Sequence, residues 1–271
     1  MNPRGLAAGA LACALLTGCA QSVDPIERLG EKAAQRVRPH GPAGTPQRPY
    51  HRWGLTAPLL AAPKPPRASR AHMAGKGLPP VVSRIRTHDK VVFLTYDDGA
   101  EKAPRFVDLV RELRLPVSMF LTDSVAGPGH GHFARLRSAG ASIQNHTVDH
   151  PALRGLPYAG QRAEICGQQD RLGSRFGTRP RLFRPPYGTY DTTTRRAAAD
   201  CGITALVLWR ASMTAAGELR YQHGANRLCP GDIVAVDPDE GTGLPLRERT
   251  VRLLRRVQAD GLTVGRLEDY V

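Results

Sequence analysis

The chain of 271 residues has few aromatic side chains, a deficit of acidic side chains and little that could cross a membrane. Aromatic residues make up 6% of it, and 24 acidic residues stand against 38 lysines and arginines, for a formal charge of +14. The sequence has neither a zinc-finger spacing nor an aromatic RNA-binding signature, so we expect no nucleic-acid partner. The positive charge fits an anionic surface or polymer, or a compositional bias without a specific partner.

The first 19 residues, MNPRGLAAGALACALLTGC, combine one arginine, a short apolar centre and a small-residue end. The apolar centre is too short for a comfortable membrane span and is typical of a secretory signal. Its end, Leu16-Thr17-Gly18-Cys19, resembles the bacterial lipobox, in which the cysteine becomes the lipidated N-terminus. We therefore expect an exported protein, held on the outer face of the cell membrane as a lipoprotein, or secreted if the signal is an ordinary cleavable one.

The cysteines are few, and two of the five, Cys13 and Cys19, belong to the expected signal. The export side is oxidising, so two of Cys166, Cys201 and Cys229 can form a disulfide while the third is left over. We predict the Cys166–Cys201 pair, because both cysteines lie in expected helices that could be neighbours. The other pairings remain open.

Residues 20–80 are rich in proline, glycine, alanine and arginine, and are expected to form a flexible linker without helices or central strands. This segment carries about seven more positive than negative charges. It either contacts anionic cell-wall polymers or is simply solvated. Trp53, Leu55, Leu59 and Leu60 are its candidates for docking on the folded domain.

Residues 81–271 are expected to form one α/β domain, because apolar runs alternate with amphipathic stretches. The expected strands are 91–95, 117–121, 142–144, 182–184, 205–208, 233–236 and 263–264, and the expected helices are 103–113, 132–139, 158–176, 192–200 and 246–260. About seven such units predict a closed or nearly closed barrel with a parallel sheet. Reactive side chains then lie at the C-terminal ends of the strands.

Polar side chains of the right kinds follow three of these expected strands. Asp97 and Asp98 end the run VVFLTYDDG, and two adjacent carboxylates repel each other unless positive charge lies beside them. His146 and His150 follow the next-but-one strand, in NHTVDHP, and FRPPYG places Arg184 after another. Two histidines and one carboxylate with an open position form a catalytic rather than a structural metal site.

The segments TYDDG, NHTVDHP and FRPPYG resemble the first three motifs of the polysaccharide deacetylase family, the NodB-type carbohydrate esterases. The resemblance covers about residues 81–271, with Tyr96 where the family usually has phenylalanine. It implies a distorted (β/α)7 barrel, which is a TIM-like NodB-homology fold, and a divalent metal ion, commonly zinc. It also implies hydrolysis of N-acetyl groups on peptidoglycan or chitin-like polymers, or of O-acetyl groups on acetylxylan.

The resemblance also assigns roles to the matching residues. Asp98, His146 and His150 would bind the metal ion. Asp97 would be the general base, and Arg184 would hold its carboxylate in place. Amide hydrolysis independently requires an activated water and a base within reach of it.

Two further residues take supporting roles by the same resemblance. The backbone N–H of Tyr187 would help to stabilise the oxyanion, and Thr147 would brace the histidine loop. Hydrolysis of an acetyl group requires such donors at the place where negative charge develops.

The late part of the family pattern is missing. Asp237 occupies the slot of the histidine that usually protonates the leaving amine, and Arg210 stands near the place of its supporting aspartate. Three outcomes are open. Asp237 could act as the acid, or the proton could come from water at the metal or from a histidine (His130, His132 or His223). The domain could instead bind metal and glycan with little turnover. We expect an Arg210–Asp237 ion pair in place of the family's pair. An O-acetyl substrate would depend less on a proton donor.

Overall fold

The computed structural model of the chain describes residues 48–65, 77–99, 102–238, 241 and 243–271. The expected signal segment with Cys13 and Cys19 lies outside the described residues, as do 20–47 and 66–76 of the expected linker. None of the helices in the described ranges combines the length and the apolar character that a membrane crossing needs.

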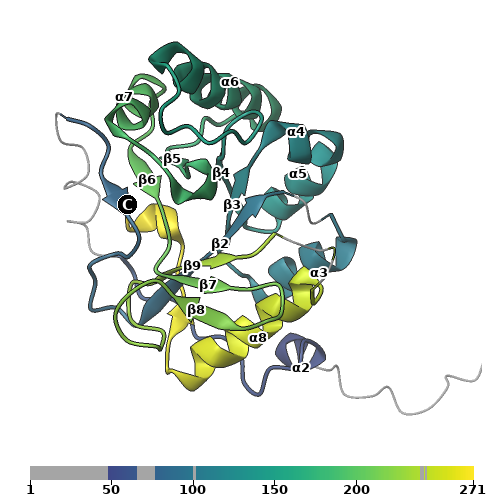
Figure 1. The fold of residues 1–271 in the computed structure, drawn as a ribbon. Helices are drawn as coiled ribbons and strands as arrows, with labels where there is room; N and C mark the ends of the chain where they lie inside the picture. Colours follow the sequence, from purple (N-terminus) through teal and green to yellow (C-terminus); the bar gives the residue numbers. More distant parts are fainter. Residues whose placement is uncertain (1–47, 66–76, 100–101, 239–240, 242) are drawn as a thin grey trace, which may run out of the picture. The chain divides into compact units, whose positions relative to one another are not determined.

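A single curled sheet organises the domain (Figure 1). Strand β2 (Val91–Asp98) lies inside it, between β3 (Ser118–Leu121) and β9 (Ile233–Val236). The full order is β1 (Val81–Val82), β6 (Ala205–Val207), β5 (Leu182–Phe183), β4 (Ser142–Asn145), β3, β2, β9, β7 (Ala211–Met213) and β8 (Leu219–Tyr221), and β10 (Thr263–Val264) pairs with the start of β2. Every pairing except β7–β8 is parallel, so the C-terminal ends of the strands meet at one edge.

The curl of the sheet follows from the short link between β6 and β7. These strands stand near opposite ends of the strand order, yet only residues 208–210 separate them in the chain. The four steps from Val207 to Ala211 reach at most about 14 Å. The two ends of the sheet therefore approach each other, as the continuous path from β6 to β7 in Figure 1 shows.

Helices cover the outer side of the sheet (Figure 1). The longer ones are α3 (Pro104–Leu113), α5 (His130–Ser138), α6 (Tyr158–Phe176), α7 (Thr192–Asp200) and α8 (Leu246–Ala259), with the short α2 (Pro49–Arg52) and α4 (Asp123–Ala126). Each longer helix matches an expected one to within a few residues. Helix α3 buries Phe106, Val107, Leu109 and Val110, the apolar spacing that predicted it.

Strand β2 is buried on both of its faces. Val92, Leu94 and Tyr96 pack with the helices in one apolar cluster, whereas Val91 and Phe93 belong to a second cluster with residues of other strands. Double burial explains why this strand is an unbroken apolar run instead of an alternating one. It also gives the acidic pair at its end a rigid base.

The segment 48–65 packs on the folded domain, although it lies within the expected linker. Trp53 and Leu55 are buried in the main core cluster, Leu59 packs against that cluster, and the indole Nε1 of Trp53 donates to Glu112 at 2.7 Å. These three docking expectations are confirmed. Leu60 is 72% exposed, so the expectation that its side chain docks is wrong.

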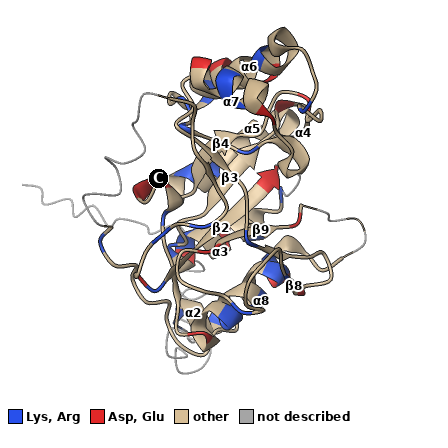
Figure 2. Cartoon of the chain, turned by 60° about the vertical axis from the view of Figure 1, so that its left-hand side comes forward, with Lys and Arg blue, Asp and Glu red and all other residues tan. Residues whose placement is uncertain are grey.

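Basic residues lie mainly in helices and loops, as the blue segments of Figure 2 show, and among the described strands only β8 contains one, Arg220. They are not gathered on a single element. The positive charge of the domain is therefore spread through the fold, and one smaller concentration of arginines in a cavity needs its own explanation.

A disulfide joins α6 to the residue that ends α7. Cys166 and Cys201 form it, with Cα atoms 5.0 Å apart, and Cys229 is the free cysteine among the described residues. The predicted pairing is thereby confirmed. The bond fixes two helices next to the strands β4, β5 and β6.

Replacing Cys201 with alanine should lower the free energy of unfolding by about 3 to 4 kcal/mol. The bond closes a loop with a sequence separation of 35 residues, and its loss restores that loop's freedom in the unfolded chain. Urea unfolding followed by circular dichroism measures the change. The matched Cys229→Ala variant should unfold at the wild-type urea concentration, and an equal shift in both variants would contradict the prediction.

Candidate active site

The predicted site residues meet at the C-terminal edge of the sheet. Asp97 and Asp98 are the last residues of β2, His146 and His150 follow β4, and Arg184 follows β5. Parallel pairing of β2, β3, β4 and β5 brings these strand ends together. The convergence expected from the sequence is present.

Three side chains place one donor atom each around a common point. Oδ1 of Asp98 lies 3.5 Å from Nε2 of His146 and 3.4 Å from Nε2 of His150, and the two Nε2 atoms are 3.2 Å apart. These donor atoms all lie within 4.8 Å of one another. Such a set of two imidazoles and a carboxylate suits several divalent cations.

The hydrogen bonding of His146 favours metal binding. Its Nδ1 lies 2.7 Å from the carbonyl oxygen of Arg184, which can only accept a hydrogen bond. The proton of a neutral ring is therefore on Nδ1, and the lone pair of Nε2 points at the common point. Burial lowers the pKa of His146, although the carboxylates of Asp97 and Asp98 oppose this, so the ring stays available as a ligand.

Backbone strain is concentrated at this edge. Asp98, Thr147, His150 and Tyr187 have φ values of 63°, 74°, 59° and 58°, a left-handed conformation that non-glycine residues seldom adopt. The one other non-glycine residue with positive φ in the described ranges, Arg114, ends a helix. Strain that persists here must be held by the surrounding contacts.

Hydrogen bonds fix the loop that carries the two histidines. The hydroxyl oxygen of Thr147 accepts from the backbone N–H of His150 at 3.0 Å, and Oδ1 of Asn145 accepts from the N–H of Thr147 at 2.9 Å. Oε2 of Glu164 accepts from two further N–H groups of the loop, both at 3.0 Å. The loop is thus a defined structure, and Thr147 makes the contact that bracing requires.

A buried ion pair holds Asp97. Nη1 of Arg184 donates to Oδ1 of Asp97 at 2.6 Å, and Nε of Arg184 donates to the carbonyl of Val207 at 3.0 Å. The guanidinium lies over the ring of Phe120 at 4.4 Å and near that of Trp209 at 5.4 Å. Burial lowers the pKa of Arg184, and Asp97 raises it again, so each member of the pair stabilises the charge of the other.

Tyr187 lies on the short 3-10 turn Pro186–Gly188, directly after Arg184. The residue is 65% exposed, and its ring stands edge-on to the ring of His150, with centroids 4.7 Å apart. The residue is therefore beside the possible metal site, with an exposed aromatic surface available to a ligand.

Asp237 lies at the same edge as Asp97. Val236, at the end of β9, pairs with Tyr96 of the parallel strand β2. The next residues, Asp237 and Asp97, therefore lie at the same height along the two neighbouring strands. The backbone carbonyl of Asp237 accepts from Nη1 of the buried Arg249 on α8. Asp237 thus lies at the edge of the sheet where the other predicted site residues meet.

The expected Arg210–Asp237 ion pair is wrong. Nε and Nη2 of Arg210 donate to the carboxylate of Asp232, each at 2.6 Å. The remaining N–H groups face the carbonyls of His223, Ala225 and Arg227, so all five donors of the guanidinium are in use.

The register explains why this ion pair does not form. The backbone N–H of Arg210 binds the carbonyl of Ile233 at the start of β9, whereas Asp237 follows the end of that strand. Four residues of extended chain, about 13 Å, separate these levels.

None of the three histidines considered as proton donors belongs to the cluster of possible metal ligands. Nε2 of His130 is 3.6 Å from Asp123, and its ring lies near Phe176. His132 is buried in α5, and the carbonyl of His223 accepts from Arg210 near the start of β9. Asp237 and water at the metal ion are the other two donors that the sequence analysis named.

Several supporting residues have no clear signal in the sequence. Thr122 follows β3, and its hydroxyl lies 3.0 Å from the carbonyl of His146 and 3.4 Å from Oδ1 of Asp98. Glu164 on α6 and Phe120 on β3 act through contacts distant in the chain. Only the position of Thr122, directly after a strand end, could have marked it beforehand.

The family profile described as polysaccharide deacetylase matches residues 84–206. Uncharacterized protein SCO4760 of Streptomyces coelicolor is 64% identical over 218 residues, which are 79% of this chain and 88% of that protein. Chitin deacetylase 1 of Cryptococcus neoformans is 32% identical over 46% of this chain and 27% of its own length. The peptidoglycan-N-acetylglucosamine deacetylase of Bacillus cereus is 31% identical over 36% of each. The match thus spans about a third or less of these two named deacetylases.

Solved structures with similar folds agree with the expected architecture. A family 4 carbohydrate esterase from Streptomyces lividans, in complex with acetate, has a TM-score of 0.55 at 24% identity and covers 65% of this chain and 92% of its own. A family 4 pseudoenzyme from Bacillus anthracis has a TM-score of 0.59 at 18% identity, covering 71% and 69%. Together with the curled sheet, they confirm the distorted (β/α)7 barrel.

The chain should bind one zinc ion, and His150→Ala should weaken that binding by at least about 100-fold. Removing a group that merely supports a ligand costs up to about 100-fold in affinity, so removing a ligand costs more. Equilibrium dialysis with metal analysis measures the affinity. The control is His130→Ala, outside the cluster, which should bind zinc as the wild type does; zinc retained by His150→Ala would refute the site.

Proposed function

We propose that this chain, which carries a polysaccharide deacetylase domain, removes acetyl groups from a cell-envelope or other polysaccharide with the help of a divalent metal ion, expected to be zinc. The family consists of hydrolases that cleave the carbon–nitrogen bonds of N-acetyl groups. The observation that carries the proposal is the meeting of Asp98, His146 and His150 beside the Asp97–Arg184 pair. Chitin-like polymers, peptidoglycan and acetylxylan are the candidate substrates.

Asp98, His146 and His150 would hold the ion, and their donor atoms fit it, because Nδ1 of His146 is turned to a carbonyl and leaves Nε2 free to coordinate. The ion, when bound, would lower the pKa of water and polarise the acetyl carbonyl.

Asp97 would take the proton from the attacking water. Arg184 binds its Oδ1, which leaves Oδ2 as the atom that accepts the proton. The backbone N–H of Tyr187, on the turn beside His150, would donate to the oxyanion.

Asp237 is a candidate acid for the leaving group, and water at the metal ion is the other donor at this edge. Asp237 follows β9 at the level of Asp97, and a carboxyl group in a dry site can act as the acid. An acetyl ester would need this proton less, since an alkoxide leaves more readily than an amine. Cleavage of O-acetyl groups is therefore the second activity to test.

The alternative function is a domain that binds metal and glycan without efficient turnover. The absence of the late-motif histidine favours it, because Asp237 stands in the slot of the residue that usually protonates the leaving amine. Resemblance in fold to a pseudoenzyme agrees with this alternative, although fold alone decides nothing about activity.

Release of acetate tests the proposal. Wild-type protein should liberate acetate from peptidoglycan, chitooligosaccharide or acetylxylan, and a chelator should abolish the release until zinc is restored. Asp97→Asn should lower the rate at least about 100-fold, because general base catalysis contributes about 10²–10⁴-fold. It should keep zinc, since Asp97 lies outside the three-ligand cluster.

Zinc binding without acetate release in the wild type would select the alternative function. Near-normal rates in Asp97→Asn would overturn the role of that residue as the base. The Cys229→Ala variant serves as the matched control for handling and should release acetate at the wild-type rate.

We also infer that the chain is exported and lipidated on Cys19, so that it acts at the outer face of the cell membrane. The lipobox-like Leu16-Thr17-Gly18-Cys19 supports this, and so does the Cys166–Cys201 disulfide, which is typical of an oxidising compartment. Cys19→Ser should move the protein from the membrane fraction to the medium or leave it unprocessed, as fractionation and immunoblotting would show. Membrane association together with wild-type processing in Cys19→Ser would refute lipidation, and a soluble wild type would indicate secretion.

A further inference from the structure

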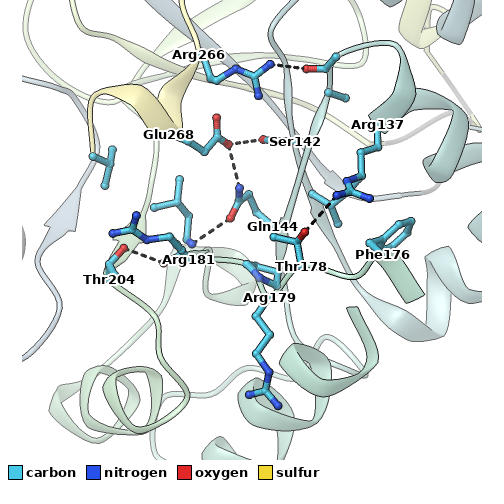
Figure 3. Close-up of a pocket in the computed structure, with 16 residues that line it drawn as sticks. Arg137, Ser142, Gln144, Phe176, Thr178, Arg179, Arg181, Thr204, Arg266 and Glu268 are labelled. Carbon is cyan, nitrogen blue, oxygen red and sulfur yellow. Dashed lines mark hydrogen bonds between the residues drawn. The ribbon is translucent and has the colours of Figure 1, made fainter. Parts of the chain in front are cut away.

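A cavity of about 400 Å³ lies at the edge of the sheet opposite to the candidate active site (Figure 3). The first residues of β4, from Ser142 to Gln144, and Leu182 at the start of β5 line it, whereas the metal-site residues follow strand ends. Arg266 and Glu268, after β10, complete the lining. This cavity therefore takes no part in the proposed deacetylation.

Arginine dominates the charge of this cavity. Among its lining residues Glu268 is the single acidic side chain, against Arg137, Arg179, Arg181 and Arg266. The guanidinium of Arg179 is 2.5 Å from Asp170, which neutralises it. The other three arginines form no ion pair with any residue that the structure describes.

The three remaining arginines keep most of their hydrogen-bond donors. Nη2 of Arg137 donates to the hydroxyl of Thr178 at 3.2 Å, and Nη2 of Arg266 donates to the carbonyl of Gly140 at 3.0 Å. Both acceptors are neutral, so they orient the guanidinium groups without cancelling their charge. A guanidinium has five N–H donors, so four stay available on each.

Glu268 does not account for these arginines. Its Oε1 accepts hydrogen bonds from the hydroxyls of Ser118 and Ser142 and, at 3.0 Å, from Nε2 of Gln144. Figure 3 shows this carboxylate turned toward Ser142 and Gln144. Neutral donors therefore stabilise its charge, and the arginines are not needed for that purpose.

The ends of helices explain only one of the arginines. Arg137 lies in the last turn of α5, where a cation interacts favourably with the helix dipole. Arg181 and Arg266 lie in no helix, and they precede β5 and follow β10. They line the cavity from different sides, and their presence there needs another reason.

We propose that this cavity binds a phosphate-bearing ligand. Guanidinium groups recognise oxyanions through paired N–H donors, and three of them reach the cavity from separate segments. A phosphate monoester presents three terminal oxygens in different directions, whereas the two coplanar oxygens of a carboxylate suit a single guanidinium. The apolar side chains of Ile143 and Phe176 in the lining offer a surface for the carrier of the phosphate, such as a sugar ring.

Isothermal titration calorimetry on the full chain tests the proposal with inorganic phosphate and glucose 6-phosphate, and with acetate and glucose as comparison ligands. Both phosphates should bind, glucose should bind at least about 10-fold more weakly or not at all, and any acetate binding should be unchanged by the arginine substitutions that weaken phosphate binding. Tighter binding of glucose 6-phosphate would identify phosphate esters as the ligand class, and equal binding would identify free phosphate.

Arg181→Gln and Arg266→Gln should each weaken phosphate binding about 10-fold or more. The matched control is Arg220→Gln on β8, which removes the same charge from a side chain 73% exposed and outside this cavity, and it should bind as the wild type does. Arg181 makes no side-chain hydrogen bond or ion pair within the described ranges, so its variant should keep the wild-type melting temperature and remain interpretable. Absent phosphate binding, acetate binding that Arg181→Gln weakens as much as phosphate binding, or an equal loss in Arg220→Gln would each overturn the proposal.

Discussion

Arg184 makes the two halves of the candidate site depend on each other. Its carbonyl oxygen fixes the ring of His146, and its guanidinium fixes the carboxylate of Asp97. A fully buried charge is costly unless it is paired and hydrogen-bonded, and here Asp97, a backbone carbonyl and the face of Phe120 provide this. The ligand geometry and the orientation of the base therefore share one support, at the end of a strand only two residues long.

The rest of the edge transmits the rigidity of the sheet to strained loops. Strand β2 is buried on both faces and ends in Asp97 and Asp98. Apolar packing of the strand therefore fixes the positions of these two acids. The histidine loop instead depends on hydrogen bonds that its backbone N–H groups donate to the side-chain oxygens of Asn145 and of Glu164 on the neighbouring helix. Left-handed residues at both places are stable because these contacts leave the chain no relaxed alternative.

The alternation of apolar runs and helical spacing was enough to predict the main strands and helices, because long periodic segments bury one face in any α/β domain. It missed β7 and β8, which have three residues each and contain the polar residues Ser212 and Arg220. That omission caused the error at Arg210. The sequence analysis treated Arg210 as the end of a strand, whereas the chain continues into β7 and puts Arg210 at the opposite level of the sheet. Partners such as Glu164 and Asp232 are set by tertiary contact, which spacing along the chain does not reveal.

The packing of segment 48–65 bears on where this domain begins. The family profile starts at residue 84, yet Trp53 and Leu55 fill part of the main core some thirty residues earlier. A truncated protein cut to the profile would uncover apolar surface on the helices that these side chains cover, and it would leave Glu112 without its indole partner. Poor solubility of such a fragment would then reflect a missing piece of the core, and expression should start ahead of Arg48.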